Sequence, residues 1–320
     1  MRASASLHKN QALKRAFIVL NPIAGNADPK TLRQAIADHF KANDWDFEIY
    51  ETTGRENLIE ITRKACEEAV DLVIAAGGDG TVAAVVNGII HKQVPLGIIP
   101  AGTGNGLAHA LKIPMDASQA IQLITGEHGI YDIDAMQIGE RFYILNVSSG
   151  ISARAMQETE PEQKRKFGIL AYIWTILKRV IGIQPTRFNL ELDDHMVRVR
   201  GTEILVSNGV LIEEPPFPVG PPERFSDHEL DVYIITADTF WDHLRVLVHA
   251  LVKSNRQSVL RHFRVQERVK IATPGFPEPA QADGELIGRT PLEIHLVPGV
   301  LPVIVPKQTL QTNHNSRRSA

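Results

Sequence analysis

Three glycine-rich segments in the first third of the chain contain residue types that can bind a phosphate chain. They are residues 21–26 (NPIAGN), 77–81 (GGDGT) and 100–106 (PAGTGNG). Glycine lets a backbone approach phosphate oxygens closely, and Thr81 and Thr103 add hydroxyl donors. The sequence contains no GxxxxGK[ST] motif, which argues against a Walker-type NTPase. The three segments therefore predict a phosphate-binding site of another kind.

The position of Asp79 between two glycines narrows the choice of ligand. A carboxylate repels phosphates unless a cation lies between them, and Mg²⁺ carried by a nucleoside triphosphate supplies that cation. Gly78-x-Gly80-x-x-Ala83 also matches a loose dinucleotide fingerprint, but the acidic ribose ligand expected about 20 residues later is missing. A nucleoside triphosphate with Mg²⁺ is thus favoured. The alternative for Asp79 is a helix N-cap.

Alternating strand and helix patterns surround these segments. Strands are predicted at residues 16–20, 45–50, 71–76 and 95–99, and helices at residues 29–41, 56–69 and 81–90. This order predicts an α/β domain, residues 1–129, with a parallel sheet covered by helices on both faces. Each glycine-rich segment follows a strand. Since the carboxyl ends of parallel strands share one edge, the segments should meet there.

The pattern changes near residue 130. Strand-like runs then follow one another at residues 131–138, 141–147, 187–192, 197–207, 230–236, 264–272 and 292–297, with helical intervals mainly at residues 167–180 and 239–253. This succession of strand patterns with few helices predicts a second, mostly antiparallel domain over residues 130–299. The polar tail, residues 307–320, is expected to be disordered.

Composition sets further limits. The chain has 320 residues, 43% hydrophobic, and a net charge of −3, so no general affinity for nucleic acid is expected. Its single cysteine, Cys66, excludes an internal disulfide framework and falls on a helical pattern typical of a packed thiol. No signal-peptide pattern and no apolar run of membrane-spanning length is present. A cytoplasmic location is expected, and the oligomeric state stays open.

Together with Asp283-Gly284-Glu285, the segments NPIAG, GGDGT and PAGTGN resemble the four signatures of the diacylglycerol kinase and sphingosine kinase superfamily, in particular its bacterial lipid kinase branch. The resemblance spans about residues 15–305. It implies an α/β nucleotide-binding domain and an antiparallel β-sandwich that carries the acceptor site. It also implies that a strand near residues 300–306 returns to the first domain.

The resemblance implies roles for individual residues. The glutamate of the fourth signature, Glu285, would accept the proton of the acceptor hydroxyl, and Asp79 would lie near Mg²⁺ or that hydroxyl. A structural Mg²⁺ would bind Asp227 and the backbone carbonyls of Arg224 and Glu229. The nucleotide would contact Asn21, Pro22, Ile23, Ala24, Gly25, Thr52, Gly77, Gly78, Asp79, Gly80, Thr81, Thr103 and Asn105. Without the resemblance, Glu285 reads as a turn residue of a hairpin around Asp283-Gly284.

The expected function is an ATP-dependent lipid kinase that phosphorylates the hydroxyl of a diacylglycerol-like or sphingoid lipid at a membrane surface. Two alternatives stay open: a kinase for a soluble acceptor such as NAD or a sugar, and a non-catalytic nucleotide-binding regulator. The chain departs from the family pattern at Asn26, at Ala83-Ala84, at Gly106-Leu107 and around His228. These departures leave the structural metal and the acceptor open. The aromatic segment 167–180 fits either a membrane contact or a core helix.

Overall fold

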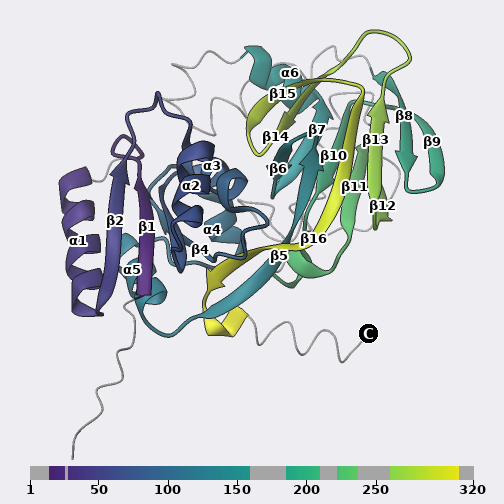
Figure 1. Cartoon of the computed structure of the whole chain (residues 1–320). Coiled ribbons are helices and arrows are strands. Elements are labelled where there is room, and N and C mark those ends of the chain that lie inside the picture. The colour runs from purple at the N-terminus through teal and green to yellow at the C-terminus, as the bar shows by residue number, and fades with distance from the viewer. Residues whose placement is uncertain (1–13, 26–27, 159–184, 210–221, 237–259, 310–320) are drawn as a thin grey trace, which may run out of the picture.

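The computed structural model describes residues 14–25, 28–158, 185–209, 222–236 and 260–309 (Figure 1). Strands and helices alternate in its first part. In chain order they are β1 (Lys14–Leu20), α1 (Pro29–Ala42), β2 (Trp45–Glu51), α2 (Leu58–Glu67), β3 (Leu72–Gly77), α3 (Asp79–Ile89), β4 (Leu96–Pro100), α4 (Gly106–Ala110) and α5 (Ala117–Thr125).

Strands dominate the second part. In chain order its elements are β5 (Gly129–Ile138), β6 (Arg141–Tyr143), β7 (Asn146–Gly150), α6 (Ile151–Glu158), β8 (Thr186–Leu192), β9 (His195–Gly201), β10 (Glu203–Ser207), a 3₁₀ turn (Pro222–Ser226), β11 (Leu230–Ile235), β12 (Leu260–Val265), β13 (Arg268–Ala272), β14 (Pro279–Ala282), β15 (Glu285–Arg289) and β16 (Leu292–Val305).

Local sequence signals explain where the first helices begin. Asp28 caps α1 by accepting hydrogen bonds from the backbone N–H groups of Lys30 and Thr31, and Pro29 occupies the first helical position, where no N–H is needed. Asn57 caps α2 through the N–H of Glu60. These caps satisfy N–H groups that have no partner within the helix.

The first domain is a parallel sheet between two helical layers. β2, β1, β3 and β4 lie side by side in that order, and all three pairings are parallel. Alternate side chains of β3 pack on opposite faces: Val73 joins the core cluster of α2 and α3, whereas Ile74 joins that of α1 and α5. Half-buried Cys66 packs against the first of these clusters. The predicted α/β fold is confirmed.

The second domain is built from two antiparallel layers that share one core. The six-stranded sheet has the order β12-β11-β10-β7-β14-β15, and it faces the β13, β8 and β16 portion of the larger sheet. Phe188 and Ile271 from the larger sheet meet Val206 and Val232 from the smaller one in that core. The antiparallel β-sandwich expected from the resemblance is confirmed.

One long strand joins the two domains. β16 pairs with β13 in antiparallel fashion near Leu292 and reaches β4 at its other end, where Val303 pairs with Leu96 in parallel. β5 runs along β16, with a register shift between Val297 and Leu301 (Figure 1). The parallel sheet of the first domain and the larger sheet of the sandwich are therefore parts of one continuous ten-stranded sheet, whereas the six-stranded sheet is separate.

The observed strands differ from the predicted ones in number. The predicted runs 141–147, 197–207 and 264–272 each correspond to two strands, and β14 and β15 were not predicted because prolines and glycines interrupt their pattern. The predicted helices at residues 167–180 and 239–253 lie outside the described residues, as does the tail beyond residue 309. Residues 307–309, expected to belong to the disordered tail, instead form a helical turn in which Thr309 is buried. Among the described residues, no helix has the length and apolar character needed to cross a membrane.

Candidate functional site

The structure brings the three glycine-rich segments together at the carboxyl edge of the parallel sheet. The N–H of Asn21, after β1, donates to the carbonyl of Ala76 at 2.9 Å, and the N–H of Ala101, after β4, donates to that of Gly77 at 3.0 Å. The Asn21 side-chain amide also donates to the Thr81 hydroxyl at 3.1 Å. Hydrogen bonds thus tie the first and third segments to the second.

Several of the glycines are required by packing between these segments. A Cβ on Gly102 would lie 2.5 Å from the Cα of Gly78, which is far inside van der Waals contact. Gly25 has φ of +63° and rests against Ala101. Gly80, in contrast, faces open space: a Cβ at that position would have Oε1 of Glu285 as its nearest neighbour, 3.8 Å away. Only part of the glycine pattern is therefore free to approach a ligand.

A cavity of about 440 Å³ opens beside these segments, a size that suits a small-molecule ligand. Seven of its lining residues were predicted as site residues: Asn21, Ala24, Thr52, Gly78, Gly80, Thr81 and Glu285. Four were not: Gly54, Glu56, Leu58 and Gly102. Pro22, Ile23, Gly25, Gly77, Asp79, Thr103 and Asn105 do not line the cavity, although they belong to or contact the same segments.

Glu56 places a negative charge in the part of this cavity that residues 52–58 line. Its carboxylate accepts hydrogen bonds from the backbone N–H groups of Thr53 at 2.6 Å and Arg55 at 2.9 Å. Its own backbone N–H and the bonds from Thr53 lower the pKa of Glu56 to about 2. Its spacing from Thr53 matches a capping box, the signal that sequence reasoning missed. This part of the cavity is therefore anionic at neutral pH.

The Asp79 carboxylate binds backbone rather than lining the cavity. One oxygen accepts from the N–H of Asn105 at 2.9 Å and the other from that of Gly106 at 2.6 Å, at the start of α4. The N-cap of its own helix, α3, is Gly78, so the alternative of a cap on that helix does not describe it. The carboxylate instead connects the second glycine-rich segment to the third, through residues 26 and 27 positions further along the chain.

Asn105 folds the third segment into a closed turn. Its backbone is left-handed, with φ of +52°. Its side-chain oxygen accepts from the Gly102 N–H at 2.9 Å, and its amide donates to the Gly102 carbonyl at 2.8 Å. Thr103 lies at the exposed tip of this turn. Asn105 and Asp79 therefore shape the segment, and Thr103 remains accessible from solution.

Glu285 reaches the cavity from the second domain. It is the first residue of β15, directly after a two-residue hairpin turn in which Asp283 and Gly284 both have positive φ, +45° and +84°. The hairpin expected from the turn pair is present, and its first strand residue also lines the cavity. The structure thus joins the two interpretations of Glu285, as a hairpin residue and as a site residue.

Asp283 anchors this hairpin to the segment between β6 and β7. Its carboxylate accepts three backbone N–H bonds, from Ile144 at 2.7 Å, Leu145 at 2.9 Å and Asn146 at 2.9 Å. Burial raises the pKa of Asp283, the three bonds oppose that rise, and the nearby Asp79 carboxylate adds to it. Since Leu145 also packs against Gly106, the hairpin and the glycine-rich segments meet through this contact.

The residues expected to bind a structural Mg²⁺ lie together at and just after the 3₁₀ turn that precedes β11. The Asp227 carboxylate pairs with the Arg224 guanidinium at 3.2 Å and accepts the Glu229 N–H at 3.2 Å. Burial raises the pKa of Asp227, and the Arg224 bond opposes it. Across the described part of the chain, no group of three or more metal-binding side chains occurs. The predicted site uses one carboxylate and two backbone carbonyls, so binding of a structural Mg²⁺ at this place stays a prediction.

Family models match both domains. The diacylglycerol kinase catalytic domain matches residues 15–138, and the YegS C-terminal NAD kinase beta sandwich-like domain matches residues 145–305. A crystal structure described as that of a diacylglycerol kinase from Bacillus anthracis superimposes with a TM-score of 0.75 at 22% identity, covering 93% of this chain and 99% of that one. That similarity shows a shared fold.

Curated relatives extend over most of the chain. An uncharacterized Synechocystis protein is 27% identical over 92% of this chain and 70% of its own length. A Staphylococcus aureus protein named "Putative lipid kinase" is 28% identical over 77% of this chain and 80% of its own length. With two family models covering both domains in the expected order, the chain belongs to the diacylglycerol kinase catalytic-domain family, with the YegS-type C-terminal β-sandwich-like domain.

Proposed function

We propose that this kinase transfers the γ-phosphate of ATP to the hydroxyl of a diacylglycerol-like or sphingoid lipid. The observation that carries the proposal is the position of Glu285. A carboxylate from the β-sandwich domain lies beside Gly80 of the GGDGT segment, and both line a cavity that all three glycine-rich segments help to form. A nucleotide held by one domain and an acceptor approaching from the other would meet there.

The charges in the cavity favour one orientation of the nucleotide. The N-terminus of α3 lies at the cavity, where Gly78, Gly80 and Thr81 line it, and the positive end of a helix dipole suits the phosphates. The part of the cavity lined by residues 52–58 carries the apolar Leu58 and the hydrogen-bond acceptor Glu56, which suit the base and the ribose hydroxyls. We therefore place the triphosphate toward Glu285 and the adenosine toward Thr52 and Leu58.

The reaction needs positioning and charge neutralisation more than covalent chemistry. The acceptor oxygen attacks the γ-phosphorus in line, and Glu285 takes the hydroxyl proton. The bond between the γ-phosphorus and the bridging oxygen breaks, and ADP leaves with that electron pair. Mg²⁺ enters with ATP as part of the substrate. Asp79 contributes by holding the third segment in place through Asn105 and Gly106.

The lipid acceptor is supported by the family and by the access to Glu285. Glu285 is exposed at the hairpin tip, so an acceptor can reach its side chain from outside the protein. A soluble acceptor such as NAD or a sugar would use the same carboxylate, and a non-catalytic regulator would not need it. The name of the Staphylococcus aureus relative describes it as a lipid kinase, and from that name and the family we infer a lipid acceptor for this chain.

An ATP-consumption assay over a panel of acceptors tests the proposal. The panel contains diacylglycerols, sphingoid bases, other lipid alcohols, NAD and simple sugars, with lipids presented in mixed micelles. The proposal expects consumption only with a lipid alcohol, together with a phosphorylated lipid identified by mass spectrometry. Phosphorylation of NAD or a sugar alone would move the assignment to the soluble-acceptor class, and ATP binding without any transfer would favour the regulator.

A further inference from the structure

A line of buried polar side chains lies under the hairpin that carries Glu285. Gln281 on β14, Ser148 on β7 and Glu203 on β10 have exposed fractions of 6%, 0% and 4%. The Gln281 amide donates to the Ser148 hydroxyl at 2.7 Å, and that hydroxyl lies 2.7 Å from that of Ser152, which in turn bonds to Glu203. Buried polar groups are costly unless they are hydrogen-bonded. These four side chains meet that condition together.

The amide of Gln281 connects the hairpin turn to the adjacent strand. Its oxygen accepts the backbone N–H of Gly284 at 3.1 Å. Its nitrogen donates to the Asn146 side chain at 2.9 Å as well as to Ser148. Its neighbours on β14, Ala280 and Ala282, have small apolar side chains without hydrogen-bonding groups. Of these three residues, only Gln281 can bind the turn through its side chain.

The Glu285 carboxylate depends on that turn for its position. Among the described residues, none is recorded as a hydrogen-bond partner of this carboxylate, and its side chain is exposed. The turn that precedes it is held at both of its residues. The Asp283 carboxylate accepts from the N–H groups of residues 144–146, and the Asp283 N–H donates to the Asn146 carbonyl at 3.0 Å. Gln281 accepts the Gly284 N–H. The placement of Glu285 relative to Gly80 therefore follows from the placement of the turn.

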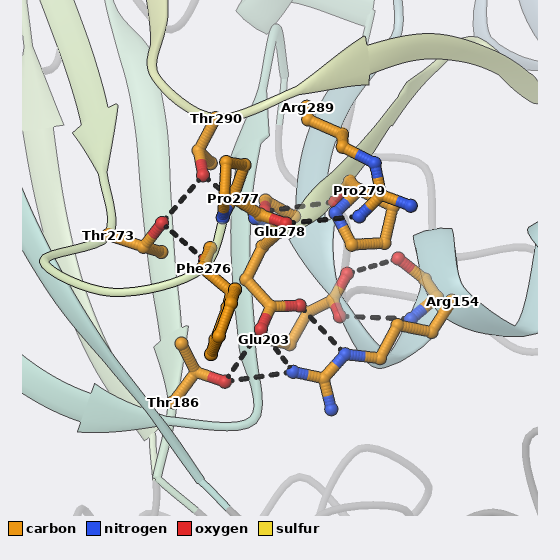
Figure 2. Close-up of polar contacts among 12 residues, drawn as sticks. Arg154, Thr186, Glu203, Thr273, Phe276, Pro277, Glu278, Pro279, Arg289 and Thr290 are labelled. Atoms are coloured by element: carbon orange, nitrogen blue, oxygen red, sulfur yellow. Dashed lines mark hydrogen bonds and ion pairs between the residues drawn. The ribbon is translucent and has the colours of Figure 1, made fainter.

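The base of the same hairpin is held separately. Arg154 on α6 donates to Glu278 at 2.8 Å and to Thr186 at 2.8 Å, and the Glu278 N–H donates to the Thr290 hydroxyl at 3.0 Å (Figure 2). The Asp283-Gly284 turn also favours hairpin formation by itself. Removing the Gln281 amide should therefore leave the hairpin formed and loosen only the turn at Gly284, next to Glu285.

We propose that Gln281 is a positioning residue, whose amide holds the 283–284 turn where Glu285 faces the GGDGT segment. The inference rests on the proposed function in one respect, namely that Glu285 accepts the proton. Gln281 touches no reacting atom and acts through Glu285. Misplacement of a reacting group by about 1 Å can cost roughly 10²-fold in rate, so the loss should appear in kcat rather than in ATP affinity.

The test compares Gln281→Met with Ser149→Ala. Methionine keeps the length of glutamine without its hydrogen bonds. Ser149 is also buried on β7, but its hydroxyl donates to the Pro279 carbonyl at 3.0 Å, away from the turn. Gln281→Met should lower kcat roughly 10- to 100-fold with ATP affinity within about twofold of wild type. Ser149→Ala should keep kcat within about twofold. An equal loss of kcat in both variants would make Gln281 merely structural.

A double-mutant cycle with Glu285→Gln decides whether Gln281 acts through Glu285. If it does, Gln281→Met should cost nothing further once Glu285 is replaced. Additive losses would overturn the inference.

Hydrogen exchange of the amides of residues 283–289 gives a readout without turnover. Gln281→Met should lower the protection of these amides, whereas Ser149→Ala should not. Unchanged protection in Gln281→Met would overturn the inference that Gln281 holds the turn. If wild type phosphorylates no acceptor, the proposed function fails, while the exchange still reports whether Gln281 holds the turn.

Discussion

The two sides of the cavity are built in different ways. On the α/β side, glycine backbones pack directly against one another, as at Gly78 and Gly102. On the β-sandwich side, the hairpin tip is held by side chains, through Asp283 and Gln281. Backbone packing tolerates no added atom, whereas a side-chain bond can be removed with the fold kept. Substitutions should therefore affect nucleotide binding on the first side and the transfer step on the second.

Among the substitutions that test this difference between the two sides, Gly102→Ala is expected to have the largest effect, a loss of ATP affinity. The new Cβ would lie 2.5 Å from the Gly78 Cα and 2.9 Å from the Asn105 side-chain oxygen, so the two segments must separate. Overpacking of this kind costs about 1–3 kcal/mol, and we expect ATP affinity, measured by calorimetry, to fall roughly 10- to 100-fold.

Gly275→Ala provides the matched control, because nothing lies within 4 Å of a Cβ at that position. It should bind ATP like wild type. Normal ATP affinity in Gly102→Ala would show that contact between the glycine-rich segments does not shape the binding site.

A smaller effect is expected from Asp79→Asn. The new amide can accept from only one of the Asn105 and Gly106 N–H groups and would direct its own NH₂ at the other. An unpaired N–H costs about 1–3 kcal/mol, so the free energy of unfolding should fall by that amount in urea titrations. We expect kcat/KM to fall about tenfold or more through misplacement of the third segment.

Asp116→Asn serves as its control. Asp116 caps α5 through the Gln119 N–H at 3.0 Å, and asparagine caps helices equally well. A normal urea midpoint for Asp79→Asn, together with a large loss of activity, would return Asp79 to the role at the metal or acceptor that the family resemblance implies.

The smallest effect is expected from Glu203→Gln, which should change the free energy of unfolding by an amount that depends on pH. Burial raises the pKa of Glu203, with hydrogen bonds from Ser152 opposing the rise. Stability from this group is therefore present at low pH and is lost as pH rises through the raised pKa. Glutamine can still pair with Ser152 but does not ionise.

Urea unfolding of wild type and Glu203→Gln at pH 5 and pH 8 measures this difference. The stability of the variant relative to wild type should increase from pH 5 to pH 8. A constant difference would mean that the folded protein binds no more protons at Glu203 than the unfolded chain does, so that its pKa is not raised into this range.

The sequence was informative where local pattern controls structure. The β1–α1–β2–α2–β3–α3–β4 order followed from alternation of apolar periods, and convergence of the glycine-rich segments followed from the parallel sheet. The contacts of Asp79 could not be predicted this way, because they join residues 26 and 27 positions apart, separated by α3 and β4. Gln281 was missed because β14 is short and its partner strand lies more than 130 residues away.

The central claim is that Glu285 contributes to transfer and not to nucleotide binding. Glu285→Gln keeps the size of the side chain but cannot take the proton. The most direct measurement is calorimetric ATP·Mg²⁺ binding and lipid phosphorylation on the same preparation, with Glu267→Gln, an exposed glutamate in the β12–β13 turn, as control. The account predicts ATP affinity within a few-fold of wild type and turnover lower by roughly 10²- to 10⁴-fold. Undiminished turnover, or equal loss of binding and turnover, would contradict it.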